Sequence, residues 1–278
     1  MTTVQSTAGS APVDLHVDDT GGDGRTVVLI HGWPLSGESW SKQVPALTDA
    51  GYRVVSYDRR GFGRSDKPED GYDYDTFAGD LDAVLTSLDL TDVTLVGFSM
   101  GGGEVARYIG TRGEDRVRAA AFVAAVPPFL FKSDDNPEGG LDDDAVAGMQ
   151  GGIREDRAGF FEGFAKAFFS AGDDLKVDQS DLDEFSRLEQ QAKVEAELAC
   201  IDAFGRTDFR GDVAKITVPT LVLHGDSDAI VPIEVSGDRT ARDVPGATKV
   251  VVEQGPHGLT ASHTDETNRA LLAFLADS

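Results

Sequence analysis

A serine flanked by glycines is the part of this sequence that points most clearly to chemistry. Residues 97–101 (GFSMG) follow an apolar run at 93–96 and precede a stretch with helical periodicity. A G-x-S-x-G segment between a strand and a helix holds the serine in a sharp, strained turn that exposes its hydroxyl. The first amides of the helix then face any negative charge that forms there. We predict that Ser99 is a nucleophile, although glycine-rich turns without a function share this pattern.

A serine nucleophile needs a base, and the base needs an acid that orients it. In a parallel sheet such groups lie at the carboxyl ends of strands. The loop after Leu223 carries Asp226 and Asp228, and the loop after Val252 carries His257. The order serine, acid, histidine is expected of an α/β-hydrolase. Asp228 is preferred as the acid because it lies further out on its loop, whereas Asp226 is suited to organising the turn.

The tetrahedral intermediate of acyl transfer needs two amide donors. The Met100 amide follows the nucleophile, and the second donor should come from the loop after Ile30. Trp33 is the natural choice because Pro34 has no N–H, and its ring can form a pocket wall as well. His31 is expected to hydrogen-bond within its own loop. No pair of histidines has metal-ligand spacing, so neither a metal nor a cofactor is expected.

The elements that must position these residues alternate along the chain. Repeated strand–helix order predicts an α/β fold with a mostly parallel sheet of the eight-stranded type, helices on both faces and right-handed crossovers. Strands are predicted at residues 13–17, 26–30, 53–57, 93–96, 117–126, 218–224 and 248–252. Helices are predicted from residue 36 or 37 through Leu47, at 77–88, after Ser99, at 234–244 and at 265–276.

The alternation stops between residues 129 and 209, where ten of the fifteen phenylalanines lie. An aromatic helical insertion after a strand end is typical of a cap over a pocket, although it could also pack as a subdomain without contacting a ligand. The predicted division is a flexible tail at 1–11, a hydrolase core at 12–128 and 210–278, and a helical cap at 129–209.

The chain has 278 residues, with 49 acidic against 25 basic side chains and a net charge of −24. Such a surface disfavours nucleic acid and anionic membranes as partners. Of the acids 35 are Asp, and only 8 of the bases are Lys. This excess of Asp over Lys resembles the composition of salt-adapted proteins, and salt adaptation is our preferred interpretation. The alternative is an ordinary acidic enzyme from a GC-rich genome. The lone Cys200, with no signal peptide or membrane span, favours a cytoplasmic location.

Six segments carry a family resemblance: 31–36 (HGWPLS), 58–61 (DRRG), 97–110 (GFSMGGGEVARYIG), 125–128 (AVPP), 219–222 (PTLV) and 256–259 (PHGL). Together they resemble the cofactor-free bacterial haloperoxidases, also called non-haem chloroperoxidases or perhydrolases. These belong with the aryl esterases of the α/β-hydrolase superfamily. The resemblance runs from about residue 13 to the end and is weaker in the cap. It implies Ser99, Asp228 and His257 as a catalytic triad and the Trp33 and Met100 amides as the oxyanion hole.

The resemblance also implies the chemistry. An ester or short carboxylic acid would acylate Ser99, and water or hydrogen peroxide would remove the acyl group. Peroxide would give a peracid, which oxidises halide in solution without haem or metal. Phe62, where relatives often carry histidine, and the acid-rich segment 134–144 depart from the family pattern. Relatives often associate, so a homo-oligomer is compatible with the resemblance.

Two rival functions remain at this stage. A plain carboxylesterase or lactonase needs the same triad. A non-catalytic binding protein with this fold would be marked by the loss of a triad residue, and none is missing. A haloalkane dehalogenase would have an aspartate at position 99.

Overall fold

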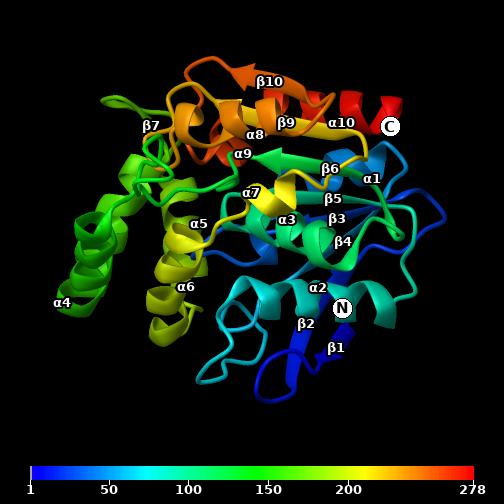
Figure 1. Cartoon of the computed structure of the whole chain (residues 1–278), viewed down its shortest axis with the longest axis horizontal. Coiled ribbons are helices and arrows are strands. Elements are labelled where there is room, and N and C mark those ends of the chain that lie inside the picture. Colours follow the sequence, from blue (N-terminus) through cyan, green and yellow to red (C-terminus); the bar gives the residue numbers. More distant parts are fainter. Residues whose placement is uncertain (1) are drawn as a thin grey trace.

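An eight-stranded sheet forms the centre of the computed structural model, which describes residues 2–278 (Figure 1). Its strands are β1 (Thr2–Ser6), β2 (Val13–Asp19), β3 (Thr26–Ile30), β4 (Arg53–Tyr57), β5 (Val93–Phe98), β6 (Val117–Val123), β9 (Thr220–Gly225) and β10 (Thr248–Val252). Their order across the sheet is β1-β2-β4-β3-β5-β6-β9-β10. All neighbouring strands from β4 to β10 pair in parallel, whereas β2 pairs antiparallel with both β1 and β4. This confirms the predicted fold class.

Helices cover both faces of the sheet, which explains why its central strands are continuously apolar. Every residue of β5 is buried, as are the last four residues of β3. Helices α2 (Tyr74–Ser87), α3 (Met100–Arg112), α7 (Arg210–Val213) and α8 (Gly237–Asp243) pack along one face. Helices α1 (Val44–Asp49) and α10 (Thr264–Asp277) pack together on the other.

Three predicted elements are shorter or more divided than expected. The helix predicted from residue 36 or 37 is a 3-10 turn, η1 (Gly37–Trp40), followed by α1, whose early Pro45 suits the start of a new helix. The helix predicted at 234–244 is likewise divided into η2 (Ile233–Val235) and α8. Strand β6 ends at Val123 because Ala124 has φ 43°, which turns the chain away from the sheet.

The N-terminal segment is ordered where a flexible tail was predicted. Strand β1 pairs with β2 over five residue pairs, from Thr2 opposite Val17 to Ser6 opposite Val13. Val4 and Ser6 are buried on one side of the strand, and their neighbours are exposed. This alternation is typical of an edge strand, but the Ser/Thr/Gly-rich composition of residues 1–11 led to the prediction of a tail. The prediction is therefore wrong for residues 2–6, and Met1 lies outside the described residues.

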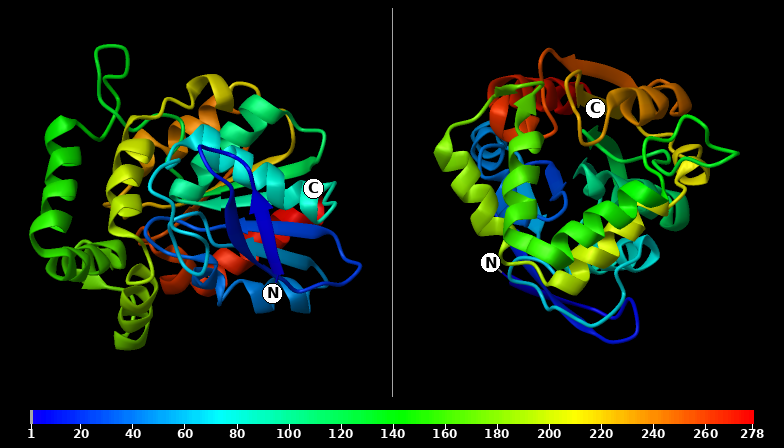
Figure 2. Two further views of the ribbon diagram at one scale, coloured as in Figure 1. Left: turned by 90° about the horizontal axis from the view of Figure 1, so that it is seen from below. Right: turned by 90° about the vertical axis from the view of Figure 1, so that its left-hand side faces the viewer.

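The insertion between β6 and α7 lies at one end of the sheet. It contains α4 (Asp143–Phe168), a short hairpin of β7 (Ser170–Ala171) and β8 (Asp174–Leu175), α5 (Gln179–Glu189) and α6 (Val194–Arg206). The arrowheads of β6 and β10 point toward α4, α5 and α6 in Figure 1, and Figure 2 shows these helices across that end. Although α4 has 26 residues, no helix in the described part of the chain has the length and hydropathy needed to cross a membrane.

Candidate active site

The strand register brings the loops of interest to one edge of the sheet. Ile30 pairs with Gly97, Phe98 with Val123, and Gly225 with Val252 at the carboxyl ends of their strands. These strand ends lie on the side of the sheet that faces α4, α5 and α6, at the left of Figure 1. Parallel strands therefore bring together residues that are more than a hundred positions apart in the sequence.

Ser99, His257 and Asp228 form a continuous hydrogen-bonded chain. His257 Nε2 lies 2.9 Å from Ser99 Oγ, and His257 Nδ1 lies 2.7 Å from Asp228 Oδ2. Their exposed fractions are 6%, 1% and 5% for the serine, histidine and aspartate. The structure thus brings together the three side chains predicted from the sequence, with the spacing that a serine nucleophile, its base and an orienting acid require.

The turn at Ser99 has the strained backbone predicted for it. Its φ of 53° and ψ of −119° lie where a non-glycine residue costs about 1–3 kcal/mol. The Ser99 amide donates to Val123 O at 2.9 Å, and Ser99 O accepts from the Val126 amide at 3.2 Å. A Cβ added at Gly97 would lie 2.5 Å from Gly101 O, so only glycine allows the strand and helix to approach this closely.

The carboxylate of Asp228 is surrounded by donors. Its Oδ1 accepts from the amides of Ile230 at 2.9 Å and Val231 at 2.8 Å, and its Oδ2 accepts from His257. His224 Nε2 lies 3.2 Å from the same Oδ2. Burial alone would raise the pKa of Asp228. The charge and hydrogen bonds supplied by His257 and His224 outweigh this effect and hold the pKa well below its usual range.

Asp226, the competing acid, does not contact His257. Its Oδ1 accepts a 3.0 Å hydrogen bond from the Ser227 hydroxyl, and its side chain is exposed. Its amide donates to Val252 O at 3.2 Å, which holds the loop after β9 against the end of β10. The geometry therefore favours Asp228 over Asp226 as the partner of the histidine.

The loop after β3 lies directly against the serine turn. A Cβ added at Gly32 would lie 3.0 Å from Ser99 Cβ. The amides of Trp33 and Met100 donate to no other protein group among residues 2–278. Met100 is also the first residue of α3, so its amide belongs to the positive end of a helix dipole. Both amides are available to an oxyanion beside Ser99.

A buried ion pair anchors the loop that carries Trp33. The guanidinium of Arg59 pairs with Glu104, which also accepts a 2.5 Å hydrogen bond from the Tyr57 hydroxyl. Arg59 Nη2 donates to His31 O at 2.7 Å, and the Arg59 amide donates to His31 Nε2 at 2.9 Å. Burial and the positive charge of Arg59 lower the pKa of His31 to about 3. His31 is therefore neutral: its Nδ1 donates to Gly32 O at 2.9 Å within its own loop, as predicted, and its Nε2 accepts from the Arg59 amide.

A cavity of about 40 Å³ adjoins the serine and histidine. Its wall carries no ionisable side chain other than His257, and residues of the insertion form much of it. Leu141 shows that the acid-rich segment 134–144, which departs from the family pattern, reaches this wall. The lining residues are Trp33, Ser99, Val126, Leu130, Leu141, Met149, Phe164, Phe204, Ile230, Val231 and His257.

The Trp33 ring joins the core to the insertion. Its centroid lies 5.5 Å from that of Phe161, 5.3 Å from Phe164 and 5.7 Å from Phe204. Its Nε1 donates to Glu197 O in α6 at 3.2 Å. The tryptophan therefore supplies both a free amide and a pocket wall, the two roles that the sequence allowed.

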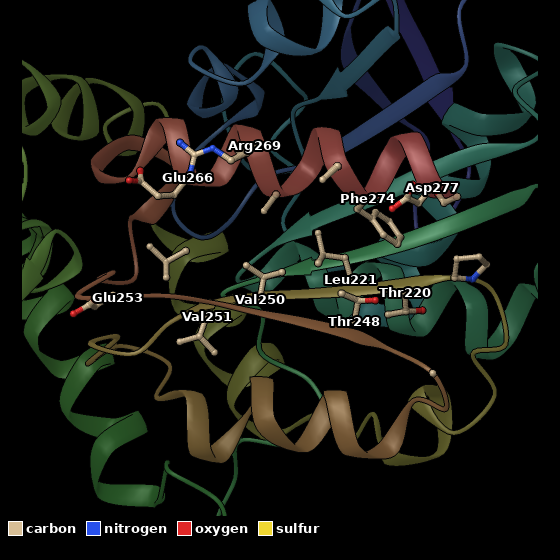
Figure 3. A pocket seen from close by; sticks show the side chains of 16 residues that line it. Thr220, Leu221, Thr248, Val250, Val251, Glu253, Glu266, Arg269, Phe274 and Asp277 are labelled. Carbon is tan, nitrogen blue, oxygen red and sulfur yellow. The ribbon is translucent and has the colours of Figure 1, made fainter.

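A larger groove of about 560 Å³ lies elsewhere, between β10 and α10 (Figure 3). Glu266 and Arg269 of α10 and Val250 and Val251 of β10 are among its labelled residues. Neither Ser99 nor a histidine lines it. Within residues 2–278, no group of three His, Cys, Asp or Glu side chains could hold a metal ion.

Two contacts to the candidate triad were not predicted. His224 was assigned only to a strand end, and its approach to Asp228 depends on how the following loop folds back. Phe168, recognised as part of the aromatic insertion, lies edge-on to His257 at a centroid distance of 5.0 Å. Phe168 O also accepts from the Gly258 amide at 2.8 Å. The number of phenylalanines between residues 129 and 209, from which a cap was predicted, does not show which of them contacts the histidine.

Comparisons with known proteins identify relatives of this chain and of its fold. The family model of the α/β-hydrolase fold matches residues 25–263. A non-haem chloroperoxidase of Kitasatospora aureofaciens is 47% identical, covering 91% of this chain and 93% of that protein. A bifunctional esterase/perhydrolase of Acinetobacter calcoaceticus is 35% identical, with coverages of 95% and 96%. The crystal structure of a bromoperoxidase from Bacillus anthracis superposes with a TM-score of 0.95 at 50% identity, covering 99% of this chain and 100% of that one.

Proposed function

Because the chain belongs to the α/β-hydrolase fold family and is an enzyme of the non-haem haloperoxidase and esterase type, we propose a specific activity for it. In this proposal the protein is a serine esterase and a cofactor-free perhydrolase. The observation that carries the proposal is the hydrogen-bonded chain from Ser99 Oγ through His257 to the buried Asp228. Its reactants are an ester or short carboxylic acid, water and hydrogen peroxide.

Acylation begins when Ser99 Oγ attacks the acyl carbonyl. His257 Nε2 takes the serine proton and then delivers it to the leaving group, while Asp228 holds the ring and stabilises the imidazolium. The amides of Trp33 and Met100 donate to the oxyanion of the tetrahedral intermediate. The acyl group is left on Ser99 as an ester.

Deacylation decides the product. His257 deprotonates either water, which gives the carboxylic acid, or hydrogen peroxide, which gives the peracid, and Ser99 Oγ recovers its proton. The peracid then transfers its terminal oxygen to a halide ion in solution, which yields hypohalite and the carboxylic acid. This last step needs no halide site on the protein.

The small volume and apolar lining of the cavity favour a substrate with a short, uncharged acyl group. Its volume of about 40 Å³ is far below that of drug-sized ligand pockets, which are ~300–1,000 Å³. Leu141, Met149, Phe164 and Phe204 from the insertion close it above Ser99. In this proposal residues 129–209 act as a cap, and residues 12–128 and 210–278 form the hydrolase core.

Partition of one acyl-enzyme between water and peroxide tests the proposal. A short ester is supplied at fixed concentration. We expect the share of peracid among the acyl products to rise, and the share of free acid to fall, as the hydrogen peroxide concentration increases. The rate of alcohol release reports the acylation step. The measurement is peracid and free acid formed per alcohol released. A ratio of peracid to acid that stays at the background of enzyme-free solution would leave a plain carboxylesterase or lactonase, the second candidate, which uses the same triad.

A non-catalytic binding protein is separated by a different measurement. An organophosphonate labels only a serine that an adjacent base activates. We expect stoichiometric labelling of Ser99, and absence of the label would favour the binding protein.

Salt adaptation is a further part of the proposal. With a net charge of −24, the folded surface repels itself more strongly than the unfolded chain. Added salt shortens the Debye length from ~10 Å at about 0.1 M to ~3 Å at about 1 M and so removes most of this repulsion. Exposed ion pairs such as Lys166 with Glu162 are weakened as well, but such pairs contribute little to stability.

We therefore expect the melting temperature to rise markedly between about 0.1 M and about 2 M NaCl or KCl. Thermal unfolding followed by circular dichroism measures it, with ester hydrolysis half-lives in parallel. Sulfate serves as a comparison because it also strengthens apolar burial. A melting temperature that stays flat or falls across the chloride series would contradict salt adaptation.

A further inference from the structure

Met149 borders the same small cavity as the nucleophile. It lies on α4, three residues after Val146 and four before Ile153, which are 2% and 3% exposed. These spacings place it on the buried face of the helix. Met149 itself is only partly buried, and it lines the cavity together with Ser99 and His257.

The insertion holds this part of α4 in place. Gln150, the next residue, donates to Leu198 O at 3.0 Å and to Asp202 Oδ2 at 2.6 Å, both in α6. Met149 is thus kept at the wall of a cavity whose other lining residues contain no sulfur. The chain has three methionines. Of the others, Met100 is 0% exposed and does not line the cavity, and Met1 lies outside the described residues.

We propose that Met149 is an oxidation site, at which peracid formed on Ser99 converts the thioether to the sulfoxide before it leaves the cavity; this rests on the proposed perhydrolase function. The terminal peroxidic oxygen of the peracid is transferred to Sδ. The O–O bond breaks, an S–O bond forms, and the proton of the transferred oxygen passes to the leaving carboxylate, which is released as the carboxylic acid. Sulfur loses two electrons and the transferred oxygen gains them, so no further reactant is needed.

The modification limits the enzyme's own activity. A sulfoxide is polar, whereas the thioether is apolar and flexible. Leu130, Leu141, Phe164 and Phe204 offer its oxygen no side-chain donor, and the cavity has little spare volume. Acyl groups therefore bind less well after oxidation, and activity falls as peracid turnovers accumulate.

The experiment follows the sulfur during turnover. The enzyme is incubated with a short ester, hydrogen peroxide and a large excess of free methionine, which consumes peracid in solution but not inside the cavity. Trypsin separates the two described methionines because Arg107 and Lys132 lie between them. Peptide mass spectrometry then measures the gain of one oxygen atom on each, and iodide oxidation in a parallel sample without methionine measures peracid.

We expect Met149 sulfoxide to increase with the amount of peracid formed, in spite of the free methionine, while Met100 stays reduced. Ser99→Ala enzyme in the same mixture should show only the slow oxidation caused by peroxide. Activity is normalised to the initial rate of each enzyme. On this scale the half-life of activity during turnover should be several-fold longer for Met149→Leu enzyme than for the wild type.

The outcomes separate the two proposals. If peracid forms but Met149 stays reduced, is fully protected by free methionine, or oxidises equally in Ser99→Ala enzyme, the oxidation site is wrong and the perhydrolase function stands. If no peracid forms, both proposals are wrong.

Discussion

Replacement of Ser99 by alanine is expected to lower ester hydrolysis and peroxide-dependent halogenation together, each by about 10⁴-fold or more. Both reactions pass through one acyl-Ser99 intermediate in the proposed mechanism. His257 Nε2 lies 2.9 Å from Ser99 Oγ, and no second hydroxyl among residues 2–278 hydrogen-bonds this nitrogen and could be activated in place of Ser99. Initial rates with a short ester, and bromination of a reporter dye with the same ester and peroxide, measure the two activities.

A matched control is available on the neighbouring loop. Ser227 also carries a hydroxyl near an aspartate, but it donates to the exposed Asp226 and not to His257. Ser227→Ala should therefore retain both activities within a few-fold. Bromination that persists in Ser99→Ala enzyme would show that halide oxidation follows a route independent of the acyl-enzyme.

The core of the fold was predictable because local pattern and long-range topology agree there. Buried parallel strands such as β5 are apolar throughout, and their order with the intervening helices dictates a doubly covered sheet. Prediction was weakest at edges and breaks. Strand β1 depends on pairing with β2, and the division between η1 and α1 depends on Pro45 within a stretch of otherwise helical spacing.

The candidate site was predictable for a related reason. Ser99, Asp228 and His257 each lie a few residues beyond a strand end, so a parallel sheet brings them to one edge whatever the rest of the chain does. The contacts of His224 and Phe168 were not predictable in this way. They depend on how a loop folds back over β9 and on where a long insertion ends, and neither leaves a local signal in the sequence.

Replacement of Asp228 by asparagine is expected to lower kcat/KM for a short ester by about 10⁴-fold, because it reverses the hydrogen-bonding polarity of His257. The carboxylate accepts from Ile230 and Val231 at Oδ1 and from His257 at Oδ2. The asparagine must keep its carbonyl oxygen toward the amides of Ile230 and Val231, because its NH₂ group is a donor and cannot accept from their N–H groups. Its NH₂ group then faces His257 Nδ1, which must become an acceptor.

The histidine would then carry its proton on Nε2, directed at Ser99 Oγ, where it cannot accept the serine proton. Asp226→Asn is the matched comparison, since it makes the same chemical change two residues away at an exposed side chain that accepts a hydrogen bond from Ser227. It should stay within a few-fold of the wild type. Steady-state kinetics of both variants, with thermal unfolding to verify that each is folded, measure the difference. A larger loss for Asp226→Asn than for Asp228→Asn would mean that the acid acting on His257 during catalysis is not the carboxylate that contacts it in this structure.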